Sequence, residues 1–104
     1  MAKLYICEYT GLGISDDRLG GNQQVGMEAG FDQTPVVIGA GSLPSNAFAA
    51  TTRLVRIHTD VICSIAFGAN PTATTNTKRL EAGQTEYFGV PPGQSFRVAV
   101  IANT

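Results

Sequence analysis

Three side chains that could take part in acid–base chemistry stand at alternate positions of one segment. Arg56, His58 and Asp60 are two residues apart, and residues with that spacing share one face of a β-strand. Neighbours on such a face lie about 7 Å apart at Cα. A general base needs a proton path and a pocket. Because the spacing alone provides neither, we interpret the three residues as a solvated face or an interface, and we predict no catalytic residue.

The thiols form no recognisable reactive centre. Cys7 and Cys63 both lie in segments with strand-like alternation, and nothing in the sequence places His58 beside Cys7. A reducing compartment favours two buried thiols over a disulfide. Two cysteines and one histidine are too few ligands for a structural zinc site, and the spacing of Asp16 and Asp17 matches no calcium loop. We therefore predict neither a metal nor a cofactor.

One glycine-containing segment begins like a dinucleotide site. A predicted strand runs into Gly39 and Gly41, and Asp60 stands 21 residues after Gly39, where a ribose-binding acid could lie. The third glycine of that motif is replaced by Pro44, and Ser45–Thr52 is too short and too β-branched for the crossover helix. We interpret the segment as a strand that ends in a flexible turn.

The charge content excludes two classes of partner. Seven basic residues are scattered and offset by eight acidic ones, so no stripe could neutralise nucleic-acid phosphates. No run approaches the roughly 18 continuous apolar residues of a membrane helix. The first residues contain no apolar stretch of the kind that a secretion signal needs, so we expect folding in the cytoplasm. Direct binding to nucleic acid or membrane is not predicted.

Few charges also suggest that another chain covers part of the surface. Charged residues are 14% of the chain, against roughly 25% in an ordinary soluble domain. Interface cores are depleted in charge in the same way. Three long segments have no charged residue at all: Gln33–Thr52, Val61–Thr77 and Tyr87–Phe96. We expect these neutral segments to face partners.

The alternation of apolar residues predicts an all-β fold. We expect one domain over residues 1–104, with about eight short strands in an antiparallel β-sandwich or jelly roll. Val55 and Ile57 should point to the core, as should Val61 and alternate residues after it. Gly30–Asp32 should form the loop of a hairpin, and residues 39–50 a loop with one helical turn at 46–49. The predicted strands are residues 3–9, 23–29, 34–38, 53–59, 61–67, 78–81, 86–90 and 95–101.

Aromatic residues beside turns are the best candidates for contact with a partner. Tyr87 and Phe88 are adjacent on a predicted strand and so point to opposite faces, and a rigid Pro91-Pro92-Gly93 turn follows them. An exposed ring in such a place makes a good interface anchor. Burial of both rings between two sheets is the alternative. The candidate interface residues are Tyr5, Phe31, Phe48, Tyr87, Phe88, Pro91 and Pro92.

About half of the chain resembles a known family. Thr52–Ile57, Ile65–Ala73 and Leu80–Val90 are similar in their strand and turn residues to small head-associated proteins of tailed bacteriophages. The resemblance implies a capsid decoration, or cement, protein that binds the outside of the assembled shell in many copies. The partner would be the major capsid protein, and the location the outer surface of the virion, after synthesis in the bacterial cytoplasm. The family has no catalytic motif.

Clamping of neighbouring capsid subunits would stabilise the shell against the pressure of packaged DNA. Linked contacts raise effective concentration, so we expect a homo-oligomer, with a trimer favoured over a dimer. Two alternatives remain open. One is a tail- or fibre-associated adaptor. The other is a carbohydrate-binding β-sandwich on the virion surface, which would need exposed aromatic rings with polar neighbours in a groove; the chain has no Trp and three Tyr.

Overall fold

The computed structural model describes residues 2–14, 22–26 and 28–103, and strands are its only regular elements in these ranges. This confirms the predicted all-β fold. The strands are β1 (Lys3–Tyr9), β2 (Leu12–Ile14), β3 (Asn22–Gly26), β4 (Phe31–Asp32), β5 (Val36–Val37), β6 (Leu43–Pro44), β7 (Leu54–Thr59), β8 (Cys63–Gly68), β9 (Lys78–Leu80), β10 (Thr85–Gly89) and β11 (Arg97–Ala102).

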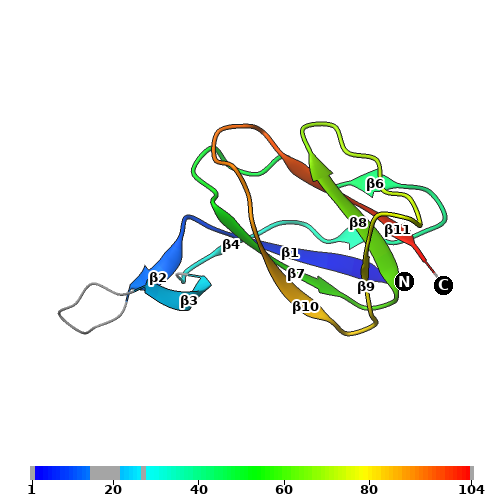
Figure 1. Ribbon diagram of the computed structural model, residues 1–104, viewed down its shortest axis with the longest axis horizontal. Helices are drawn as coiled ribbons and strands as arrows, with labels where there is room; N and C mark the ends of the chain where they lie inside the picture. Colours follow the sequence, from blue (N-terminus) through cyan, green and yellow to red (C-terminus); the bar gives the residue numbers. More distant parts are fainter. Residues whose placement is uncertain (1, 15–21, 27, 104) are drawn as a thin grey trace.

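Two antiparallel sheets form the sandwich (Figure 1). In the five-stranded sheet, β7 lies between β10 and β1, and the far side of β1 pairs with β4 and then with β5. In the four-stranded sheet the order is β6-β11-β8-β9. A separate β2–β3 pair extends from one end of the sandwich (Figure 1). The predicted antiparallel β-sandwich is therefore confirmed.

The core lies between the two sheets and follows the alternation of the strands. Val55 and Ile57 are fully buried, as predicted, and Leu4 and Ile6 of β1 lie on the same inner face. The opposite sheet contributes alternate residues of β8 and β11. The buried cluster consists of Leu4, Ile6, Val36, Ile38, Phe48, Val55, Ile57, Cys63, Ile65, Leu80, Val90, Val98 and Val100.

Five predicted strands appear with small shifts at their ends, namely those at residues 3–9, 53–59, 78–81, 86–90 and 95–101. β9 lies at the edge of its sheet, as a short edge strand should. The predicted strand from Val61 begins only at Cys63, and Val61 itself is exposed rather than in the core. Although β7 and β8 are separated by three residues, they belong to different sheets, so Asp60–Ile62 carries the chain from one layer to the other.

The prediction was wrong for several short segments in the first half of the chain. Phe31–Asp32 is not a hairpin loop but strand β4, because it pairs with Cys7 and Glu8 of β1. Leu12–Ile14, which lies outside the predicted strands, forms β2 and pairs with β3. Strand β5 is shorter than the predicted 34–38. Long-range pairing overrides local pattern in segments this short.

The segment at residues 39–50 also differs from its prediction. Leu43–Pro44 forms β6, which pairs with β11, and no helical turn occurs at Asn46–Ala49. Phe48 N–H donates to the Phe96 carbonyl at 2.8 Å. This bond holds the segment beside the start of β11, which begins at Arg97. After Gly41 the chain therefore enters the second sheet instead of a crossover helix.

Candidate functional site

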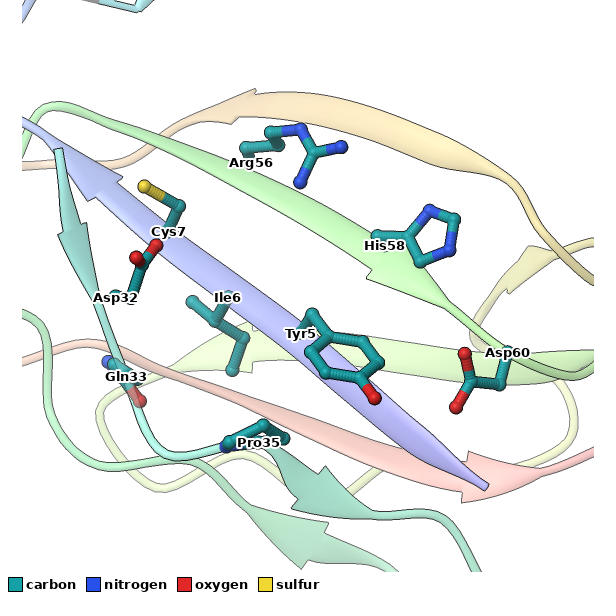
Figure 2. Close-up of a pocket in the computed structure, with 9 residues that line it drawn as sticks. All are labelled: Tyr5, Ile6, Cys7, Asp32, Gln33, Pro35, Arg56, His58 and Asp60. Carbon is teal, nitrogen blue, oxygen red and sulfur yellow. The ribbon is translucent and has the colours of Figure 1, made fainter. Parts of the chain in front are cut away.

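A groove of about 610 Å³ opens on the outer face of the five-stranded sheet, the face turned away from the core. Figure 2 shows its walls: Arg56 and His58 stand on one side of the Tyr5 ring, and Asp32, Gln33 and Pro35 on the other. The residues that line it are Tyr5, Ile6, Cys7, Asp32, Gln33, Pro35, Arg56, His58 and Asp60. The groove is thus apolar at its floor and polar at its rim.

Strand register brings these residues together from distant parts of the chain. Tyr5 of β1 is paired with His58 of β7. Cys7 is paired with Arg56 on one side and with Asp32 of β4 on the other. Paired residues in a sheet point to the same face. The sequence placed Arg56 and His58 on one face, but only the register adds Tyr5, Cys7 and Asp32 to it.

A β-bulge in the edge strand deepens the groove. Cys7 is paired with Asp32 and Leu4 with Val36, so the two residues Tyr5–Ile6 lie opposite the three residues Gln33–Pro35. The Gln33 N–H donates to the Ile6 carbonyl at 3.0 Å, while Pro35 has no N–H to donate. The extra residue bends the edge away from β1. Gln33 and Pro35 of this bulge line the groove on the side of the Tyr5 ring opposite Arg56 and His58 (Figure 2).

Aromatic rings remain accessible along this face. Tyr5 is 41% exposed, and its ring centre is 6.2 Å from that of His58. Tyr87, at the far edge on β10, is 43% exposed and lies 6.5 Å from the ring of Tyr9. Tyr9 is buried, and its hydroxyl donates to Glu28 at 3.0 Å. Burial raises the pKa of Tyr9, so this hydroxyl stays protonated at neutral pH.

The geometry does not assemble a catalytic relay from Arg56, His58 and Asp60. The Asp60 carboxylate accepts a hydrogen bond from the Lys3 backbone N–H at 3.1 Å. The His58 Nδ1 atom is hydrogen-bonded to the Thr85 hydroxyl at 2.7 Å. The carboxylate therefore does not orient the imidazole, which a base of the triad type requires. The three residues border a groove instead.

The thiols are likewise not activated. Cys7 is half-buried and free, and burial, together with the neighbouring Asp32, raises its pKa against the opposing effect of its hydrogen bond to Tyr9. Burial also raises the pKa of Cys63, whose Sγ donates to the Thr59 hydroxyl at 3.4 Å. A raised pKa disfavours the nucleophilic thiolate. Cys63 lies in the core between the sheets, as predicted, whereas Cys7 belongs to the outer face.

Most of the predicted interface residues are exposed, and the two phenylalanines Phe48 and Phe88 are the exceptions. Tyr5 and Tyr87 lie on the outer face, and Phe31 on β4 is 63% exposed. Pro91 and Pro92 are exposed in the turn after β10. Phe88 is half-buried, with its ring 5.0 Å from Phe67 of the other sheet, so the Tyr87–Phe88 pair does place one ring outside and one inside.

Phe48 is a correction to the predicted interface. Its side chain is 6% exposed and belongs to the core cluster, where its ring centre lies 6.4 Å from that of Phe67. Gln33 and Pro35, by contrast, line the groove although the sequence analysis gave them no role. Pro35 stands inside the predicted strand 34–38, and a proline there is typical of a bulge or an edge strand. This was the sequence feature that could have indicated the bulge.

Metal and membrane sites find no support in the part of the chain that is described. No group of three or more His, Cys, Asp or Glu residues there could hold a metal ion. Asp16 and Asp17 lie outside the described residues. None of the described segments forms a helix long and apolar enough to cross a membrane. Comparison with family models, curated proteins and solved structures gave no match.

Proposed function

We propose that this protein is a bacteriophage capsid decoration protein that binds the outside of the assembled shell in many copies through the outer face of its five-stranded sheet. The observation that carries the proposal is the exposure of Tyr5 and Tyr87 on the outer face of this sheet, which has no second layer over it among the described residues. Aromatic rings of this kind are common anchors of protein interfaces. The resemblance of Thr52–Ile57, Ile65–Ala73 and Leu80–Val90 to phage head proteins supplies the class of partner.

The low charge and the all-β fold suit a mechanical role. A sandwich in which 14% of the residues are charged removes few charges from water when a partner covers one of its faces. A protein that contacts two capsid subunits at once resists their separation, since its own contacts must also break. Many weak contacts of this kind reinforce one another when they are linked. The partner is the major capsid protein, and no step requires a cofactor.

A binding assay with capsid shells tests the surface. Shells that lack this protein should bind it to saturation, and the double replacement Tyr5→Ser with Tyr87→Ser should weaken binding about 30-fold or more, because truncation of buried aromatic anchors costs about 2 kcal/mol or more. Leu43→Ser is the matched control, since Leu43 is similarly exposed but lies on β6 of the other sheet. Co-sedimentation of labelled protein with shells measures both.

Copy number separates decoration from the adaptor alternative. Hundreds of copies per particle, and a loss of heat resistance when the protein is removed, are expected for decoration. A handful of copies at one vertex would support a tail- or fibre-associated adaptor instead. Unchanged heat resistance after removal would count against the stabilising role, and equal effects of the Leu43 and Tyr5–Tyr87 replacements on binding would count against the proposed surface.

Carbohydrate binding is the second candidate function, because the groove has features that sugar sites need. Tyr5 presents a ring 41% exposed, and the polar groups of Asp60, His58 and Arg56 surround it. A sugar stacks an apolar face on such a ring while its hydroxyls bond to the rim. On a glycan array, we expect binding that Tyr5→Ala reduces at least about tenfold and Leu43→Ala leaves unchanged. An array without any bound glycan would remove this candidate.

A further inference from the structure

Strand β10 has an unpaired edge. It pairs with β7 on one side, and no strand of the described residues pairs with its other side. Proteins usually protect such an edge with Pro, with Lys or with a very short strand. Thr85–Gly89 is five residues long and contains neither Pro nor Lys. The edge therefore has the features of a strand that pairs with another chain.

The hydrogen-bonding pattern shows which backbone groups are free. At the two ends of the β7–β10 ladder, Thr59 N–H donates to the Gln84 carbonyl at 3.2 Å and Val90 N–H donates to the Arg53 carbonyl at 2.9 Å. Alternate residues of an antiparallel strand bond to the same neighbour. Even-numbered residues of β10 thus bond to β7. The N–H and C=O groups of Thr85, Tyr87 and Gly89 point away from it.

We propose that β10 pairs antiparallel with β10 of a second copy of this chain, about a two-fold axis at Tyr87. In this register Tyr87 lies opposite Tyr87 of the second copy, and Thr85 lies opposite Gly89. All of these residues have free backbone groups, so each pair can exchange two N–H···O bonds. The interface is isologous, as a two-fold axis requires. The two five-stranded sheets become one continuous sheet.

Charge complementarity supports this register. Glu86 of one copy lies opposite Phe88 of the other, and the Lys78 Nζ atom lies 5.7 Å from the centre of the Phe88 ring in its own chain. The pairing therefore brings the Glu86 carboxylate next to Lys78 of the second copy, twice by symmetry. Arg79 and Glu81 form the one ion pair found within the described ranges. Neither Glu86 nor Lys78 therefore has an oppositely charged partner among the described residues.

The paired sheet has a geometric consequence. Residues opposite each other in an antiparallel pair point to the same face, so both copies of Tyr87 and both grooves lie on one side. Such a dimer presents two equal surfaces to a flat partner. A two-fold axis makes a dimer, and the inference departs here from the trimer that the sequence favoured. It does not depend on capsid binding, because it is measured on the protein alone.

Sedimentation equilibrium tests the pairing. Over a range from about 10 μM to about 1 mM, the mass should rise toward that of a dimer. Tyr87→Pro removes an outward N–H together with the exposed ring at the two-fold axis but no hydrogen bond to β7, so it should lower the association constant at least about tenfold while β10 stays paired with β7. Val37→Pro is the matched control. Val37 lies on the opposite edge of the same sheet, and its N–H also points away, because its neighbour Ile38 bonds to Ala2.

A charge exchange provides the second arm. Glu86→Lys and Lys78→Glu should each weaken association, and the double variant should restore it, with circular dichroism confirming the fold of each. A monomer at the highest concentration, a trimeric mass, or equal weakening by Tyr87→Pro and Val37→Pro would overturn the proposal. Failure of the double variant to restore association would overturn the Glu86–Lys78 register.

Discussion

Replacement of Glu8 by alanine is expected to lower the free energy of unfolding by about 3–5 kcal/mol. Glu8 is 3% exposed, and its carboxylate accepts hydrogen bonds from Gln33 Nε2 at 2.8 Å, the Ala49 N–H at 2.8 Å and the Thr52 hydroxyl at 2.6 Å. The replacement leaves three donors unpaired in or near the core. Each such loss costs about 1–3 kcal/mol. Urea denaturation followed by circular dichroism measures the change.

Two variants calibrate this result. Glu8→Gln keeps the size of the side chain but presents an amide N–H to groups that are themselves donors. It should therefore lower the free energy of unfolding, but by less than Glu8→Ala does. Glu81→Ala removes an exposed carboxylate from a surface ion pair with Arg79 and should change stability by less than about 0.5 kcal/mol. A cost below about 1 kcal/mol for Glu8→Ala would mean that the three donors find other partners.

The Glu8 network also explains how a segment without long strands is held in place. Ala49 and Thr52 lie between β6 and β7, and Gln33 lies in the bulge beside the groove. One carboxylate therefore joins both segments to β1. Loss of Glu8 should disturb the edge strand next to Tyr5, so binding assays of such variants need a folding control.

Ile57→Ala is expected to destabilise the protein by about 2–5 kcal/mol. Ile57 is fully buried at the centre of the five-stranded sheet, where it is paired with Ile6 and with Glu86. Truncation removes apolar contacts from both the sheet and the opposite layer and leaves a cavity that a close-packed sandwich fills poorly. Thermal and urea unfolding should both show the loss.

A graded series makes this prediction specific. Ile57→Val removes one methylene group and should cost about 0.5–1.5 kcal/mol. Val61→Ala removes apolar groups from a residue that is exposed, and it should change stability by less than about 0.5 kcal/mol. An equal effect at positions 57 and 61 would show that the core lies elsewhere than between these sheets.

Long alternating segments were predictable because their own residues determine which face is buried. Lys3–Tyr9 and Arg53–Thr59 place β-branched or long apolar residues at every second position, and a strand can bury only one such set. Glu8 was not assigned a role, although the same alternation aligns it with Leu4 and Ile6. The signal for a buried carboxylate was present there, but its three donors come from segments 25 to 44 residues away.

Short strands could not be predicted, because their existence depends on partners. Phe31–Asp32 and Leu43–Pro44 have two residues each, and only pairing with β1 and β11 makes them strands. The groove arises in the same way. The sequence placed Arg56 and His58 on one face, but the bulge at Gln33–Pro35 results from pairing one edge segment to β1 in two registers.

The amino-acid sequence by itself determined the all-β class, most of the long strands and the inward direction of Val55 and Ile57, since alternation and turn residues act locally. Tertiary structure alone decided that β7 and β8 lie in different layers, that Phe48 is buried and that no strand of the described residues pairs with the outer edge of β10. These features depend on which distant segments meet, and that choice follows from the packing of the whole core rather than from any one stretch of residues.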